Sequence, residues 1–111
     1  MLKKYSIVDE EGTNYGILTY APETKAWHIE INPVRSWEDS PLSLALYIKQ
    51  SIYSLDEKQS LDWVRDRLVP PNRQNIHHLL EALNLPEYDE FALLHHTQGI
   101  SPNDNLHLVE I

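Results

Sequence analysis

The segment AWHIEIN, at residues 26–32, alternates apolar and polar side chains in a strict period of two. Trp27, Ile29 and Ile31 share one side of this alternation. Successive side chains of an extended chain point to opposite faces of a sheet, so the pattern predicts a β-strand with one buried face. The fold then depends on which segments pair with this strand and which cover its apolar face.

Two upstream segments are the expected pairing partners. KYSIVD (4–9) and NYGILTY (14–20) are short runs rich in β-formers, and the turn EEGT between them carries Gly12. Their spacing predicts a hairpin with a loop of about four residues. A second turn, PETK at 22–25, leads into the strand described above. A three-stranded antiparallel meander is therefore expected at the N-terminus.

The next segment, SPLSLALYIKQSIYS (40–54), supports two assignments. Leu42, Leu44 and Leu46 alternate as in a strand, whereas the step from Leu44 to Ile48 is typical of a helix. We expect extended structure at its start and helix at its end.

A clearer helix is predicted over SLDEKQSLDWVRDRL (54–68). Ser54 and Glu57 have the spacing of a capping box at its N-terminus. One face of this helix is apolar and carries Leu61, Val64 and Leu68.

The joint RLVPPNRQN (67–75) is expected to end that helix and begin another. Pro70 and Pro71 end it, because proline lacks a backbone donor and restricts the preceding residue. Asn72 is a suitable N-cap for the following helix. That helix has an apolar stripe with full amphipathic spacing, formed by Ile76, Leu79, Leu80 and Leu83.

The last third predicts one more helix and one more strand. Asp89 can cap a helix over EFALLHH (90–96), with Gly99 at its C-terminal end. LHLVEI (106–111) is expected to form the final strand. The whole chain, 1–111, is thus predicted to be a single α+β domain: a small antiparallel sheet of N-terminal meander plus C-terminal strand, covered by about three helices.

The amino-acid composition limits the classes of function that the chain can have. The chain has 111 residues, 41% of them hydrophobic and 23% charged, which is typical of a globular protein. It has no cysteine, and no apolar run long enough for a signal peptide or a membrane span, so a cytoplasmic protein without membrane attachment is expected. The 9 basic residues are scattered along the chain and are outnumbered by 17 acidic ones, which gives a net charge of -8. This charge balance argues against direct nucleic-acid binding. The acidity serves solubility or, alternatively, a partner with a basic face.

The motifs of catalysis are missing from the sequence. It has no nucleophile elbow, no kinase catalytic loop and too few glycines for a phosphate cradle. The acidic run Asp9–Glu11 falls in a turn and is interpreted as solvated charge. The pairs His77/His78 and His95/His96 suggest a metal site, but adjacent helical residues point about 100° apart, so each pair offers one ligand at most. We therefore predict a protein that is not an enzyme and holds no cofactor or metal.

Several large or cationic side chains are candidates for contact with a partner. Trp and Arg are common energetic anchors of protein interfaces. Trp37 lies in an expected loop, where it either covers a sheet edge or anchors a partner, and Trp63 lies on a helix, where core packing is the competing interpretation. Arg73 and Gln74 would occupy the first turn of a helix, where an arginine opposes the helix dipole and needs a specific acceptor, either a carbonyl or a carboxylate such as Asp104 or Asp66. They would then form a structural clamp or, alternatively, a clamp that faces a partner. The predicted partner-binding residues are Trp37, Trp63, Arg67, Arg73 and Gln74.

The order of motifs RLVPPNRQN, EYDEFALL and TQGISPNDNLHL resembles the end of the N-terminal subdomain of HipA-type serine/threonine kinase toxins. Positions that match the family's turn, later helix and glycine are Leu68, Val69, Pro70, Asn72, Arg73, Asp89, Phe91, Leu93, Leu94 and Gly99. Upstream, YGILTY followed by SPLSLAL is similar to the same subdomain. The chain departs from the family at Asn105-Leu106, where the pattern has Gly-Ala, and it carries no kinase domain.

The resemblance implies a small stand-alone, HipS-like protein that docks on a separately encoded HipA-like kinase and regulates it. It would be an antitoxin or an accessory subunit of a toxin-antitoxin system. The alternatives are a small metal-dependent hydrolase that uses the histidine pairs, or an adaptor unrelated to kinases. The sequence does not predict whether the chain forms homo-oligomers.

Overall fold

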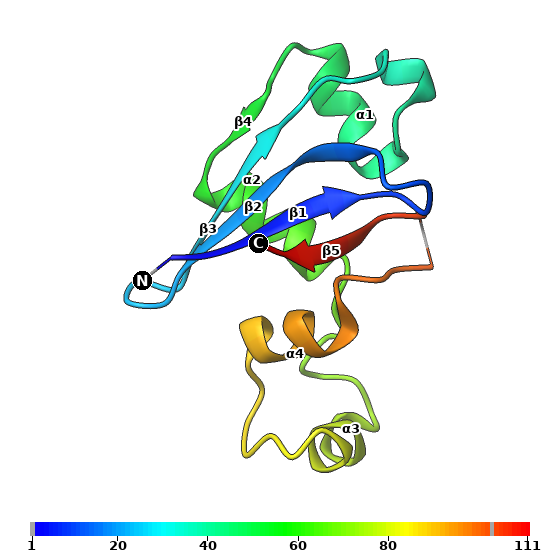
Figure 1. The fold of residues 1–111 in the computed structure, drawn as a ribbon. Helices are drawn as coiled ribbons and strands as arrows, with labels where there is room; N and C mark the ends of the chain where they lie inside the picture. Colours follow the sequence, from blue (N-terminus) through cyan, green and yellow to red (C-terminus); the bar gives the residue numbers. More distant parts are fainter. Residues whose placement is uncertain (1, 103) are drawn as a thin grey trace.

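The computed structural model describes residues 2–102 and 104–111 and contains a five-stranded antiparallel sheet in the order β4-β3-β2-β1-β5 (Figure 1). The strands are β1 (Lys3–Val8), β2 (Asn14–Ala21), β3 (Ala26–Ile31), β4 (Ser54–Leu55) and β5 (His107–Glu110). The predicted meander is β1 to β3, and the predicted final strand pairs with β1. The α+β fold class is confirmed.

The sheet buries one face only. Register places Tyr5 opposite Leu18, Leu18 opposite Ile29, and Ile29 opposite Leu55, and all four side chains are buried. Residues between them in sequence, such as Ile17, point to the other face and are more exposed. The period-two pattern of the sequence therefore reports the inner face of this sheet correctly.

The turn between β1 and β2 is organised by a buried carboxylate. Oδ1 of Asp9 accepts hydrogen bonds from the backbone N–H groups of Glu11 and Thr13, both at 2.9 Å, and Oδ2 accepts one from the Tyr15 hydroxyl at 3.3 Å. The interpretation of Asp9 as solvated charge is wrong, because its side chain closes the turn from inside. The neighbouring Glu10 and Glu11 are exposed as expected.

Helix α1 (Leu42–Lys49) is helical from its first residue, so the extended start expected for the 40–54 segment is wrong. The chain enters through Pro41, which suits the position before a helix because it needs no donor there. The leucines at alternate positions lie on two sides of this helix: Leu44 faces the core, while Leu42 and Leu46 face outward. The extended structure in this region comes after the helix, in the short strand β4, where Leu55 pairs with Ile29.

Helix α2 (Glu57–Arg65) begins with a capping box, although not the predicted one. Asp56 accepts from the backbone N–H of Gln59 at 2.7 Å, and the Gln59 side chain accepts from the backbone N–H of Asp56 at 3.1 Å. Ser54 cannot take this role because it pairs with β3 as part of β4. Of the predicted apolar face, Val64 and Leu68 are buried and Leu61 is half-buried.

Helix α3 (Ile76–Ala82) begins later than expected. The double proline is followed by turns, and the N-cap is Asn75 rather than Asn72, without a side-chain hydrogen bond. Arg73 and Gln74 consequently lie before the helix and not in its first turn. The backbone of this joint closes turns instead, with the N–H of Arg73 bonded to the Pro70 carbonyl at 3.2 Å and the N–H of Ile76 to the Arg73 carbonyl at 3.1 Å.

Helix α4 (Glu90–Thr97) is capped as predicted, since Asp89 accepts from the backbone N–H of Ala92 at 3.2 Å. It ends through two left-handed residues, Gln98 with φ 56° and Gly99 with φ 67°. In Figure 1, α4 lies below the sheet and α3 lies farther from it.

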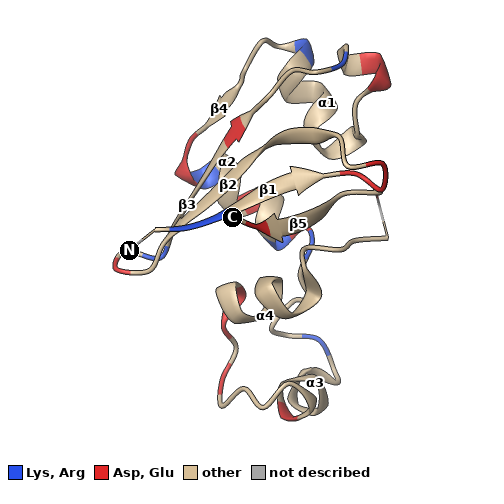
Figure 2. Ribbon diagram, viewed as in Figure 1, with Lys and Arg blue, Asp and Glu red and all other residues tan. Residues whose placement is uncertain are grey.

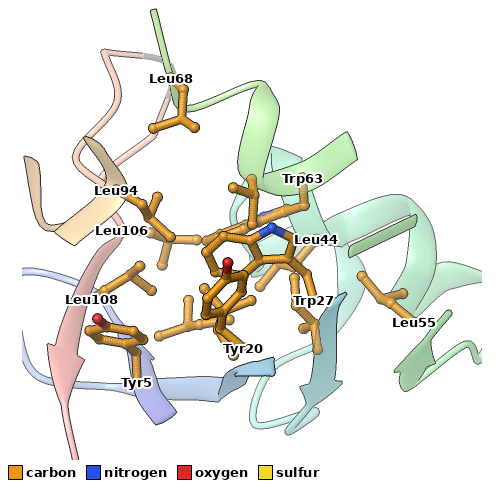
Figure 3. Packing of buried hydrophobic residues seen from close by; sticks show 14 of the residues in the cluster. Tyr5, Tyr20, Trp27, Leu44, Leu55, Trp63, Leu68, Leu94, Leu106 and Leu108 are labelled. Carbon is orange, nitrogen blue, oxygen red and sulfur yellow. The ribbon is translucent and has the colours of Figure 1, made fainter. Parts of the chain in front are cut away.

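One apolar core joins these elements (Figure 3). Trp27 and Tyr20 pack with ring centroids 4.4 Å apart, and Tyr20 stacks on Phe91 of α4 at 4.6 Å. Trp63 of α2 is only 4% exposed and lies in the same cluster. The body measures 41 × 29 × 23 Å.

Candidate protein-binding surface

The outer side of α1 is apolar and open to solvent. Leu42 is 77% exposed and Leu46 62% exposed, far more than leucines of a helix that has buried its apolar residues. The two are one helical turn apart, and Lys49 continues the same face one turn later. Helix α1 therefore has a buried side and a second apolar side that no described residue covers.

Trp37 adjoins this side. It lies in the short 3-10 helix η1 (Trp37–Asp39) that precedes α1, and it is 39% exposed. Nζ of Lys49 sits 4.6 Å from the centroid of its ring, a cation–π contact that fixes the indole beside the helix. Together Trp37, Leu42, Leu46 and Lys49 form what we call the α1 face. In Figure 2 the ribbon beside α1 is red where η1 carries Glu38 and Asp39.

A pocket of about 410 Å³ opens beside the α1 face and shares Leu42 with it. Helix α1, the end of α2 and the segment before β5 contribute its walls. The remaining lining residues are Ser43, Tyr47, Trp63, Asp66, Arg67, Ser101 and Asp104. We call this hollow the α1 pocket.

The α1 pocket is built around a buried ion pair. Nη2 and Nη1 of Arg67 bind the two carboxylate oxygens of Asp104 at 2.5 and 2.7 Å, and both side chains are at most 5% exposed. The guanidinium also donates to the carbonyl oxygens of Gly99 and Leu106, at 2.5 and 3.1 Å. It lies 4.5 Å from the ring centroid of Trp63. This Arg67–Asp104 clamp ties the end of α2 to the segment that leads into β5.

Asp104 is held in its charged form. Burial alone would raise its pKa, but hydrogen bonds from Arg67 and from the backbone N–H of Leu106, the positive charge of Arg67 and a hydrogen bond from Ser43 together lower the pKa below its usual value. The Leu106 and Ser43 bonds measure 3.0 and 2.9 Å. A carboxylate with this many donors is structural and is not a general base at neutral pH.

This lowered pKa predicts a loss of stability in acid. A carboxylate whose pKa is lower in the folded state contributes stability above the unfolded pKa of about 3.9. That contribution disappears as the pH falls through the lower folded value. We expect the urea midpoint of the wild type to fall steeply below about pH 4. The midpoint of Asp104→Asn should start lower and vary less over the same range, and equal slopes for the two proteins would contradict the assignment.

The structure separates the predicted partner-binding residues into three sets. Trp37 is exposed on the α1 face. Trp63 and Arg67 line the α1 pocket, but as whole residues they are only 4% and 8% exposed, so their first role is to build the core and the clamp. Arg73 and Gln74 are exposed in the loop before α3 and do not line the pocket.

The carboxylate acceptors predicted for Arg73, Asp104 and Asp66, are wrong. Asp104 binds Arg67 instead, and within residues 2–102 and 104–111 the Arg73 guanidinium makes no ion pair. Leu42 and Leu46 were not predicted as site residues. The signal was available in the sequence, because a helix over 42–49 places leucine on opposite sides of its axis.

The histidine pairs do not come together as a metal site. His77 and His78 are exposed on α3, whereas His95 on α4 shares a hydrogen bond of 3.0 Å between its Nδ1 and the Tyr5 hydroxyl. Among the described residues, no group of three His, Asp or Glu side chains is placed to hold a metal ion. The hydrolase alternative gains no support from this arrangement.

A second hollow of about 660 Å³ lies where the double proline meets the sheet. Pro70 and Pro71 form one side, and Tyr20, Trp27 and Phe91 supply aromatic surface. Its charged residues largely offset one another, with Arg65 bound to Glu90 at 2.7 Å. The 67–75 joint is thus a turn between two helices with a hollow beside it.

The part of the chain that the structure describes has no helix with the length and apolarity needed to span a bilayer. In comparisons with known proteins, no family model, no curated protein and no solved structure matches this chain.

Proposed function

We propose that this chain is a non-catalytic protein-binding subunit that docks on a separately encoded HipA-like kinase and regulates it, as an antitoxin or an accessory subunit. The observation that carries the docking role is the α1 face, where Leu42 and Leu46 remain 77% and 62% exposed. The kinase as partner is supported by the sequence resemblance to the N-terminal subdomain of HipA-type toxins.

Apart from Lys49, the side chains of the α1 face are apolar, and covering them would stabilise a complex. Each leucine that a partner covers gains about 1.5–3 kcal/mol from burial. Trp37 adds a large ring that Lys49 already holds in place, so little of its freedom is lost on binding. Glu38 and Asp39 border the patch and would face basic residues on the rim of the partner.

The net charge of -8 fits the same interpretation. An acidic body accelerates association with a basic partner and repels acidic proteins. The effect weakens with salt, because exposed charges are screened over about 8 Å at physiological ionic strength. Association with the kinase chain is therefore expected to slow as salt increases.

The paired substitution Leu42→Asp/Leu46→Asp tests the docking role. Two carboxylates on the α1 face would have to be desolvated in the complex, at a cost of at least about 2 kcal/mol, which corresponds to roughly a 30-fold loss of affinity. Stability should change little, since both side chains are exposed. Co-expression with a candidate HipA-like kinase chain from the genomic neighbourhood of this one, followed by titration calorimetry, gives the affinity.

The matched control is Val109→Asp/Ile111→Asp, which adds the same charge to exposed apolar positions at the β5 edge. This control should bind the kinase as the wild type does. Equal affinities for all three proteins would place the interface elsewhere. Failure of the wild type to form any complex with the kinase chain would reject the proposed function.

A further inference from the structure

The hollow of about 660 Å³ beside Pro70 and Pro71, which we call the proline hollow, contains a tyrosine hydroxyl without a partner. Tyr20 lines this hollow and is 8% exposed. Phe91 stacks on its ring and Trp27 packs against it, so the ring is held in place (Figure 3). Its hydroxyl makes no hydrogen bond to any described residue. A polar group on a side chain this buried usually has a partner, so the unpaired hydroxyl calls for an explanation.

The Tyr20 hydroxyl can be reached from the hollow. Among the described side chains, the polar atom that is both shut off from the surface and unpaired is the indole nitrogen of Trp63. The hydroxyl of Tyr20, which is also unpaired, is therefore open to the surface. The pKa of Tyr20 is raised first by burial and then by the carboxylates of Asp89 and Glu90, both of which line the hollow. The hydroxyl thus lies on the side of the hollow.

The charges around this hydroxyl select a cation. Among the lining residues, three carboxylates outnumber the two cations, Lys25 and Arg65. Both charged groups that affect the Tyr20 pKa are carboxylates, so the potential at the hydroxyl is negative. A ligand that reaches the hydroxyl is therefore expected to be positively charged.

The free acceptors and the walls narrow the kind of cation. Oδ1 of Asp89 accepts from the backbone N–H of Ala92 at 3.2 Å, whereas its second oxygen has no partner among the described residues. A ligand that serves both this oxygen and the Tyr20 hydroxyl needs at least two donors. Pro71 and Phe91 add apolar surface for a stem. Arginine has five N–H donors in a planar fork on an apolar stem, and it is less strongly hydrated than lysine, which favours its burial at an interface.

We propose that the proline hollow binds an arginine side chain of a protein partner. The guanidinium donates to the hydroxyl of Tyr20 and to the carboxylate of Asp89, and the stem packs against Pro71 and Phe91. In Figure 1 the turn between β2 and β3, which carries Lys25, lies at the end of the sheet away from α1, so this contact is separate from the α1 face. The inference rests on the proposed docking function in taking the arginine from a protein partner, and it names a second point of contact.

The test uses small probes on the whole chain, labelled with ¹³C in the rings of its six tyrosines. Nα-acetyl-arginine amide is compared with Nα-acetyl-citrulline amide, which has nearly the same shape but no charge. We expect the arginine derivative to shift the Tyr20 resonance to a saturating value, while Tyr53, which is 38% exposed and does not line the hollow, stays in place. A shift that does not saturate, or an equal shift with the citrulline derivative, would overturn the proposal.

Two variants identify the groups that bind the guanidinium. Tyr20→Phe removes a hydroxyl that no described residue uses, and Asp89→Asn removes a charge but keeps the helix cap, because asparagine caps as well as aspartate. Each should weaken binding of the arginine derivative about tenfold, the usual loss for a hydrogen bond to a charged group. The resonance of Tyr88, which also lines the hollow, follows binding in these variants.

The matched control is Asp39→Asn, which makes the same change of charge on η1, outside the hollow. Its affinity for the arginine derivative should equal that of the wild type. An unchanged affinity in Tyr20→Phe or Asp89→Asn, or an equal loss in Asp39→Asn, would contradict the proposal.

The two hypotheses fail separately. A chain that binds the kinase but not the arginine derivative retains its docking function and loses the arginine site. A chain that binds the arginine derivative but no kinase retains the site and loses the proposed partner.

Discussion

Replacement of Arg67 by methionine is expected to lower the free energy of unfolding by about 3–5 kcal/mol, the usual cost of removing one partner from a buried ion pair. The guanidinium holds both oxygens of Asp104 and two backbone carbonyls, and it covers the ring of Trp63. Methionine fills a similar volume but donates nothing. Asp104 would then stay buried at 5% exposure with its charge uncompensated.

Urea denaturation of the purified protein measures this loss. The matched control is Arg65→Met, which breaks the Arg65–Glu90 pair on the surface, where Arg65 is 59% exposed. An exposed pair contributes at most about 1 kcal/mol. The double variant Arg67→Met/Asp104→Leu should recover part of the loss, because it removes the stranded charge as well. A change of less than about 1 kcal/mol for Arg67→Met would mean that the clamp does not stabilise the fold.

Gly16→Ala is expected to produce the second large effect. Gly16 lies in β2 opposite Ile31 and has φ +156°, a backbone conformation that L-residues rarely adopt. A Cβ atom at this position would collide with the backbone carbonyl oxygen of Glu30, which cannot rotate away as a side chain could. Backbone strain and overpacking each cost about 1–3 kcal/mol, so the sum predicts a loss of about 2–6 kcal/mol.

Gly12→Ala provides the control for this prediction. Gly12 also has a positive φ, +84°, but a Cβ atom there meets no atom within 4 Å. Only the cost of the left-handed backbone remains, about 1–2 kcal/mol. Thermal or urea unfolding of the two variants separates strain from collision. If Gly12→Ala were the more destabilising of the two, the close approach of β2 and β3 at Gly16 would be refuted.

The sheet could be predicted because its signal is local. The alternation of Trp27, Ile29 and Ile31 is visible in the sequence, and each of these side chains is buried in β3. Asp89 likewise caps α4 through a backbone N–H three residues away. Helix α1 was misjudged because leucines on both of its sides imitate the period of a strand.

The candidate site was only partly predictable because it depends on distant contacts. Trp37 drew attention because a large ring in an expected loop has no obvious place in the core, and the structure leaves it 39% exposed. The partner of Arg67, by contrast, lies 37 residues away in sequence, and no spacing rule points to Asp104. The pocket beside Trp63 is formed by α1, α2 and the segment before β5 together, so it cannot be predicted from any one of these segments.

The pairing of β5 with β1 also has a consequence for how the chain folds during synthesis. Tyr5 lies opposite Glu110, so the hydrogen bonds on the outer edge of β1 are not satisfied until β5, about 100 residues later in the sequence, has emerged. Contacts between residues so far apart slow folding. During that interval a nascent molecule exposes an unpaired edge strand, the kind of template on which other chains assemble, and this exposure ends only when β5 pairs with β1.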